Sequence, residues 1–242
     1  ATIIHAARWI NILSSAALVA LILLIVSKIT LSISILIVTG VLSCFSIPLT
    51  NVWSMAWTEP LFILMITLTL FVISKPKHPF IFALLAGLLT AAAILTRYAG
   101  IVLLPVVITF IFISQPGCVR KRCKWAALYA LPPVVMFTLY VVRNYAVSGT
   151  LLGFRAPGRF GISDNVDLVK DVILAWFLPW RIRTFETFIL FMCILIGAMG
   201  WQHRQHIARV IRNSDWIVLL CVAFGITYTA FIICTSTTTA YD

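Results

Sequence analysis

Acidic residues are scarce in this chain, so each one can be weighed as a candidate for chemistry. The 242 residues include seven Asp and Glu against 18 Lys and Arg, and the formal net charge is +11. Glu59 stands in NVWSMAWTEPLF, after two Trp residues that are typical of a membrane interface. With Thr58 as N-cap and Pro60 in the first turn, Glu59 would belong to an ordinary helix start. Alternatively, a carboxylate held at the membrane surface would bind a metal ion or a substrate group.

Arginine residues supply the opposite charge at two places. Arg97 lies in AAILTRYAGIVLLP, within a polar tripeptide that leaves no room for a long loop between two apolar segments. It is either a snorkelling side chain at a helix end or a cation for a lipid-linked phosphate, which its planar guanidinium suits. The segment 143–159, RNYAVSGTLLGFRAPGR, contains three Arg and three Gly but no acid. We expect a turn-rich loop there, which carries ordinary juxtamembrane charge or holds a phosphate or a sugar.

The other motifs carry less chemistry. His203 and His206 share a helix face, but no third metal ligand is visible near them and the segment is basic, which favours contact with lipid headgroups. The six Cys residues lie mostly in apolar segments, where Cys behaves as a small hydrophobic residue. Phosphate-binding loops, dinucleotide-binding glycine motifs and the common hydrolase motifs are absent from the sequence.

The elements that position these residues must be membrane helices. Hydrophobic residues make up 62% of the chain, charged residues 10%, and the mean hydropathy is +1.09, whereas soluble domains contain about 25% charged residues. A soluble enzyme, a disordered chain and a disulfide-rich secreted module are therefore excluded. Runs such as LVALILLIV do not alternate as barrel strands do, and a backbone in lipid must satisfy its own hydrogen bonds. We predict an all-α polytopic bundle, one transmembrane domain over residues 1–242, with about eight spans: 9–27, 30–47, 60–74, 79–95, 99–114, 125–142, 185–200 and 216–234.

A second kind of helix is predicted in the long loop that follows residue 143. In SDNVDLVKDVILAWFLPWRIR the apolar residues can share a broad face, which is typical of a helix lying in the membrane interface. Trp176 and Trp180 would then lie at the level of the headgroups. Asp164, Asp167 and Asp171 would form the solvated face of this helix rather than a catalytic cluster.

The short basic loops predict the orientation. They contain Lys28, the pair Lys75 and Lys77, the cluster at 120–124 and the segment 204–212, with almost no acid, so we place them on the cytoplasmic side. The segments with Glu59, Arg97 and residues 143–183 then face the exoplasmic side.

Residue 1 would also be exoplasmic in this orientation. The chain begins ATIIHAARWI, without an initiator Met or a signal peptide, so we expect a fragment whose N-terminal span and first exoplasmic loop are missing. We expect truncation at the C-terminal end as well, because TSTTTAYD follows a span without a closing feature.

Three segments together resemble a known family. TEPLFILMITLTLFV, LLAGLLTAAAILTRYAGIVLLPV and VVRNYAVSGTLLGFRAPG, in this order, resemble integral-membrane glycosyltransferases of the GT-C type. The nearest group is the PMT/ArnT-like transferases, of the dolichyl-phosphate-mannose-protein mannosyltransferase type. The opening AARWINILSSAALVALILLIV resembles the stretch after the first exoplasmic loop of that family.

The resemblance implies transfer of a sugar from a polyprenyl-phosphate carrier to an exoplasmic lipid, glycan or protein, in the plasma membrane (the bacterial inner membrane). The family's catalytic Asp lies in the first exoplasmic loop, which would precede residue 1, so the fragment itself would be inactive. Glu59 matches the family's second acid and is thus the candidate catalytic residue and a candidate ligand of a divalent metal ion. Arg97 with Tyr98 matches a TRY segment, and Arg143 with Asn144 an RN pair. The candidates for binding the donor phosphate are Arg97, Tyr98, Arg143, Asn144 and Arg155.

The implied chemistry agrees with the residue types. A lipid phosphate is a good leaving group whose developing charge Arg or a metal ion can stabilise, and the acceptor needs one carboxylate to take its proton. The expected partners are the polyprenyl-phosphate sugar donor and membrane lipids, and no nucleic acid. A transporter or flippase of a lipid-linked or anionic substrate is the alternative, although transporters place polar residues near the bilayer midplane. A non-catalytic membrane subunit also fits the sequence.

Overall fold

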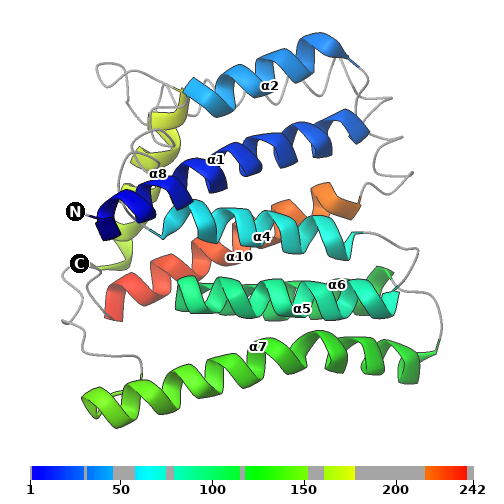
Figure 1. The fold of residues 1–242 in the computed structure, drawn as a ribbon, viewed down its shortest axis with the longest axis vertical. Coiled ribbons are helices and arrows are strands. Elements are labelled where there is room, and N and C mark those ends of the chain that lie inside the picture. The colour runs from blue at the N-terminus through cyan, green and yellow to red at the C-terminus, as the bar shows by residue number, and fades with distance from the viewer. Residues whose placement is uncertain are drawn as a thin grey trace.

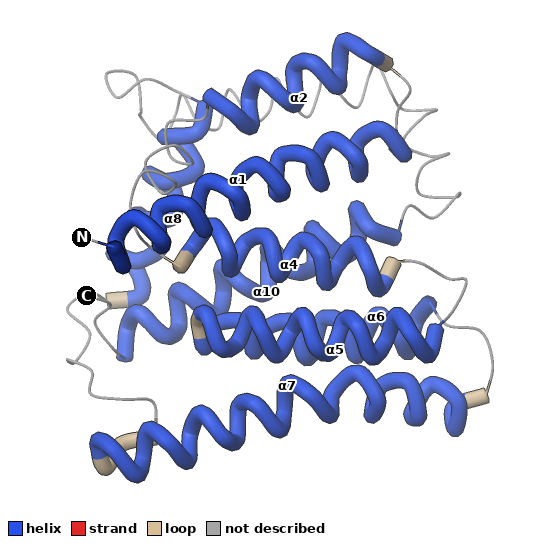
Figure 2. The backbone as a smooth tube through the Cα atoms, viewed as in Figure 1, coloured by secondary structure: helices blue, strands red, loops and turns tan. Residues whose placement is uncertain are grey.

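The computed structural model describes residues 2–29, 32–45, 58–74, 79–114, 118–151, 161–177 and 216–238. All secondary structure in these ranges is helical (Figure 2). The helices are α1 (Thr2–Ile29), α2 (Ile33–Phe45), α4 (Glu59–Ile73), α5 (Pro79–Thr96), the 3₁₀-helix η1 (Tyr98–Val102), α6 (Leu103–Ser114), α7 (Val119–Ser148), α8 (Ile162–Phe177) and α10 (Trp216–Thr238).

Most of these helices lie side by side with roughly parallel axes, and neighbours in the chain from α1 to α7 alternate in direction (Figure 1). The starts of α4 and η1 and the ends of α5, α7 and α10 therefore lie at one end of the bundle. We call this the site end, because it contains Glu59 and Arg97. The starts of α7 and α10 lie at the opposite end, which we call the basic end after residues 120–124.

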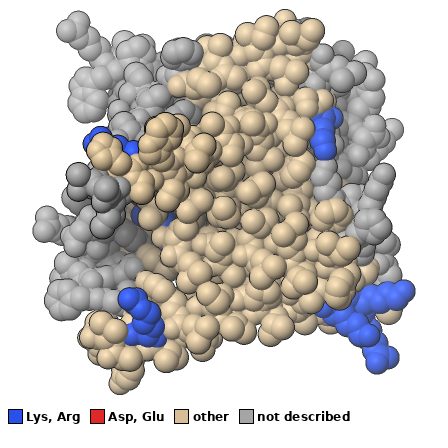
Figure 3. Space-filling model, viewed as in Figure 1, with Lys and Arg blue, Asp and Glu red and all other residues tan. Residues whose placement is uncertain are grey.

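The described part of the chain is all-helical and apolar, as the composition predicts, and this is typical of a membrane protein. Within it, three helices are long and apolar enough to cross a membrane, over His5–Ile29, Val119–Ser148 and Trp216–Ser236. Each of the other predicted spans within the described residues contains a shorter apolar helix, whereas 185–200 lies outside those residues. The number of crossings stays a prediction. On the face drawn in Figure 3, Lys and Arg lie only near the ends of the helices, as a lipid-facing surface requires.

The predicted start of the loop after the sixth span is wrong. The sequence indicated a span over 125–142 and a loop from residue 143, but α7 continues without a break to Ser148. The helix ends at Gly149, whose backbone is left-handed (φ 68°) and whose N–H donates to the carbonyl of Tyr145 at 2.9 Å. Glycine is the residue that adopts this conformation without strain, and no such residue occurs earlier in the segment. Arg143 and Asn144 are therefore helical.

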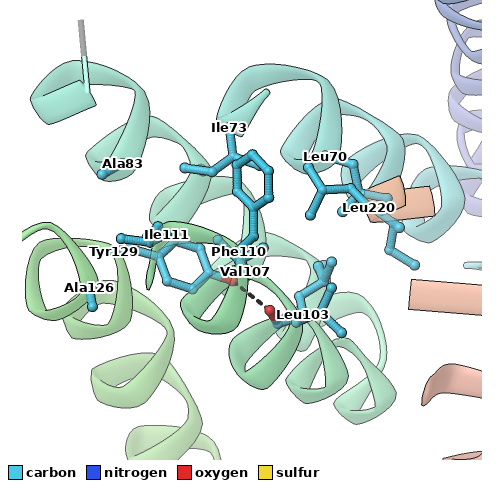
Figure 4. Packing of buried hydrophobic residues seen from close by; sticks show 14 of the residues in the cluster. Leu70, Ile73, Ala83, Leu103, Val107, Phe110, Ile111, Ala126, Tyr129 and Leu220 are labelled. Carbon is cyan, nitrogen blue, oxygen red and sulfur yellow. Dashed lines mark hydrogen bonds between the residues drawn. The ribbon is translucent and has the colours of Figure 1, made fainter. Parts of the chain in front are cut away.

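The main core joins α4, α5, α6, α7 and α10 around Tyr129, which is fully buried (Figure 4). The Tyr129 hydroxyl donates to the carbonyl of Leu103 at 3.1 Å, so the Thr90 hydroxyl, 3.1 Å away, donates to Tyr129. These two bonds satisfy the phenol inside the bundle, where an unpaired hydroxyl would be costly.

Helices α5 and α7 approach each other closely at Gly87. Pro133 has no N–H to donate to the carbonyl of Tyr129 four residues earlier, and this carbonyl lies against Gly87. A Cβ atom at Gly87 would stand 2.4 Å from that oxygen and 3.3 Å from the ring of Pro132. Glycine is thus required for this packing.

Candidate functional site

Glu59 and Arg97 form an ion pair at the site end. Nη1 of Arg97 donates a hydrogen bond to Oε1 of Glu59, although the two residues are 38 positions apart in the chain. Their side chains are 22% and 35% exposed, respectively. The pair is therefore enclosed enough to be held by its neighbours and open enough to be reached by a ligand.

Arg97 is positioned by a rigid break between two helices. It is the single non-helical residue between α5 and η1, and its backbone is extended (φ −151°, ψ 128°). Its N–H donates to Ala93 and its carbonyl accepts from Gly100, each at 2.9 Å. A Cβ atom at Gly100 would lie 2.8 Å from the backbone nitrogen of Ile94, so glycine permits the tight return of the chain. The guanidinium thus leaves a backbone that is fixed on both sides.

Glu59 is positioned by the start of α4. Pro60 follows it in the first turn and is buried, as the sequence predicts for a helix start. The predicted capping role of Thr58 is wrong, because its side chain makes no capping bond. The backbone of Thr58 is already helical (φ −84°, ψ −7°), and its carbonyl accepts the N–H of Phe62 at 3.0 Å. A carboxylate in this first turn is favoured by the helix dipole.

Aromatic residues of α10 pack against residues that neighbour the pair in α4 and η1. The ring of Tyr98 packs against Phe231 at 6.1 Å between centroids, and Tyr228 packs against Phe62 at 6.1 Å. The ring of Tyr228 also stacks on Phe224 at 5.4 Å between centroids. Sequence reasoning missed Tyr228, because a single Tyr in the apolar run FGITYTAFII is indistinguishable from an ordinary core aromatic residue.

The other candidate residues for phosphate binding are not joined to this pair. Arg143 is exposed and Asn144 half-buried in the last turns of α7, which ends at the site end (Figure 1). Within the described ranges, no hydrogen bond or ion pair links either residue to Glu59 or Arg97. The 30 residues of α7 extend over about 45 Å, whereas a hydrocarbon core is about 30 Å thick. Arg155, His203 and His206 lie outside the described residues.

The described residues do not fit a divalent metal ion at Glu59. In this part of the chain no group of three or more His, Cys, Asp or Glu side chains is placed to hold a metal. The carboxylate of Glu59 is instead paired with the guanidinium of Arg97, whose positive charge repels cations.

An anion fits the pair better. Arg97 uses Nη1 for Glu59, while a guanidinium has five N–H donors in a fixed plane. The N–H groups that do not contact Glu59 can therefore donate to the oxygens of a phosphate, and charge-assisted, bidentate hydrogen bonds of this kind are the strongest. The arrangement can thus bind an anionic group beside a carboxylate that takes up a proton.

No family model, curated protein or solved structure matches the chain. The resemblance to the GT-C type glycosyltransferases accordingly stays a prediction from the sequence. The functional argument is carried by the geometry of the Glu59–Arg97 pair.

Proposed function

We propose that this protein is a membrane glycosyltransferase that moves a sugar from a polyprenyl-phosphate donor to an exoplasmic acceptor. The observation that carries the proposal is the partly open ion pair of Glu59 with Arg97 at one end of an apolar helix bundle. The phosphate of a lipid donor lies at that level of a membrane, while its chain lies in the hydrocarbon.

The roles of the two residues follow from their charges. Arg97 binds the phosphate and stabilises the negative charge that develops on it as the bond between phosphate oxygen and sugar carbon C1 breaks. The acceptor oxygen forms the new bond to C1, and its proton passes to a carboxylate, for which Glu59 is the candidate among the described residues. Tyr98 follows Arg97 in the chain and packs against Phe231, and we assign it a supporting role in binding the phosphate.

The compartment is part of the same proposal. The short loops rich in Lys and Arg favour the cytoplasmic side, which leaves the site end on the exoplasmic side of the bacterial inner membrane. Eight crossings and an interfacial position of α8 complete this topology. The sequence pattern of α8, with its three Asp residues on one side, supports the interfacial position.

The test is release of polyprenyl phosphate in membranes that contain the protein expressed from its complete gene. Synthetic polyprenyl-phosphate hexoses and pentoses, labelled in the sugar, serve as donors, and label in the acceptor fraction is counted. Arg97→Gln should lower the rate by roughly 10- to 150-fold, since hydrogen bonds to charged groups contribute about 1.5–3 kcal/mol. Glu59→Gln should lower it as strongly. Lys28→Gln, which removes one charge at the basic end, is the matched control and should retain the rate.

A transporter or flippase gives the opposite result. It moves the labelled donor across the membrane with the sugar bond intact, so no donor releases polyprenyl phosphate above the level of membranes without the protein. That outcome would replace the transferase proposal with the transport alternative.

A further inference from the structure

Helix α7 begins at the basic end with four basic residues within five positions. The sequence RKRCK covers residues 120–124, two positions after the N-cap residue Cys118. Nη1 of Arg122 donates to the carbonyl of Phe112 at 2.8 Å and so fastens this end of α7 to α6. Arg120, Lys121 and Lys124 are exposed. A group of Lys and Arg side chains projects from the bundle where α7 begins (Figure 3).

This placement is electrostatically unfavourable within the protein itself. A helix N-terminus carries a partial positive charge, so cations in the first turn are disfavoured there. Arg120 and Lys124 are also four residues apart, where like charges repel. The first turn contains no acid, and the side chain of Cys118 makes no capping bond. In the described part of the chain, none of these cations takes part in an ion pair. An external anion would relieve this repulsion.

The surface of α7 beyond the cations identifies the kind of anion. At helical spacing, Arg120 and Lys124 continue into Ala127, Leu131 and Val135 on one exposed face. Leu131 is 62% and Val135 47% exposed, although both are apolar. A face that passes from cations to apolar side chains along the helix axis matches a phospholipid, with an anionic headgroup followed by acyl chains.

We propose that the start of α7 binds the phosphate of an anionic phospholipid. Arg120, Lys121 and Lys124 contact the headgroup, and the acyl chains lie along Leu131 and Val135. This site is independent of the Glu59–Arg97 pair, which lies at the other end of the bundle. The bound lipid fixes the start of α7 at the headgroup level of one leaflet.

The expected effect follows from the number of charges. Each Lys or Arg near an anionic membrane surface contributes about 1 kcal/mol, which is roughly fivefold in affinity, so three of them contribute about 100-fold. The triple variant Arg120→Gln, Lys121→Gln, Lys124→Gln should therefore bind the lipid roughly 100-fold more weakly.

The experiment uses the protein expressed from its complete gene, in an uncharged detergent, with dioctanoyl phosphatidylglycerol as probe and dioctanoyl phosphatidylcholine as the neutral comparison. Native mass spectrometry measures the dissociation constant of the first bound lipid. Lys28→Gln is the matched control, because Lys28 ends α1 and its Nζ atom lies 4.9 Å from the ring centroid of Phe71. The Lys28→Gln variant should have a dissociation constant within about twofold of the wild-type value. A charge-preserving variant, Arg120→Lys with Lys124→Arg, should retain binding and separates lost charge from lost folding.

Three results would overturn the proposal. The first is equal affinity of the wild-type chain for the two lipids. The second is binding by the triple variant within a few-fold of wild type. The third is displacement of the lipid by inorganic phosphate at equal concentration, which would make the site one for a free anion rather than for a lipid.

Discussion

Replacing Gly87 with Ala should separate α5 from α7 and destabilise the bundle. The new Cβ atom would lie 2.4 Å from the carbonyl oxygen of Tyr129, whereas an ordinary C···O contact is about 3.3 Å, so the helices must part by roughly 0.9 Å. Both neighbours of the new atom are rigid, since one is backbone and the other is the ring of Pro132. The strain cannot therefore be relieved by a side-chain rotation.

The magnitude follows from what that separation breaks. Overpacking a helix contact costs about 1–3 kcal/mol. The 3.1 Å bond between Thr90 and Tyr129 would lengthen beyond hydrogen-bonding distance, at a further cost of about 1 kcal/mol. We expect Gly87→Ala to lower the free energy of unfolding by roughly 2–4 kcal/mol.

The assay is an SDS titration of the protein in dodecyl maltoside, with the free energy of unfolding read from the midpoint and slope. Gly225→Ala is the matched control, because a Cβ atom at Gly225 meets nothing within 4 Å. A second arm adds Tyr129→Phe, which should cost less in the Gly87→Ala background than in wild type because one of its bonds is already lost. Equal stability of Gly87→Ala and Gly225→Ala would refute the reasoning.

Three further predictions concern the ends of the helices. Gly100→Ala should displace η1 against α5 and thereby weaken transfer as Arg97 variants do, without removing a charge; unchanged transfer would show that the turn does not position Arg97. Gly149→Ala should fray the last turn of α7 through a left-handed strain of about 1–2 kcal/mol, seen as faster amide exchange at residues 145–148; unchanged exchange would contradict it. The backbone N–H of Lys121 lowers the pKa of the exposed Cys118 thiol, so more thiolate is present at any pH below that pKa. Alkylation of Cys118 by iodoacetamide should therefore have its midpoint at a lower pH in the folded chain than in the SDS-unfolded chain, and coincident midpoints would contradict the contact.

The sequence predicts the helices well where one physical signal dominates. Long apolar runs without charges can only be helices in lipid, and α4, α5 and α10 follow the predicted spans closely, whereas α1 begins seven residues before its predicted span. The polar tripeptide around Arg97 correctly marks a break between two helices. The prediction that a loop begins at residue 143 is wrong because Arg, Asn and Tyr are compatible with a helix. The residue that ends the helix, Gly149, comes several positions later.

The site was less predictable than the helices. Glu59 and Arg97 could be singled out by charge, but their pairing depends on how α4 packs beside α5, and no local pattern encodes that. Tyr228 of α10 packs against Phe62 of α4, although it lies more than 100 residues further along the chain. The buried bonds of Tyr129 likewise join three helices, and they became visible only in the packed bundle.

The most direct test of the central claim is a charge swap of the ion pair. The double variant Glu59→Arg, Arg97→Glu keeps one cation and one anion in contact, so it should recover the stability that either single variant loses. If Arg97 holds the donor phosphate, the swap moves the cation to α4, and release of polyprenyl phosphate should stay as low as in Arg97→Gln. Restored stability with lost transfer is the predicted result. Restored transfer together with restored stability would show that the pair is only a structural contact and would contradict its assignment as the functional site.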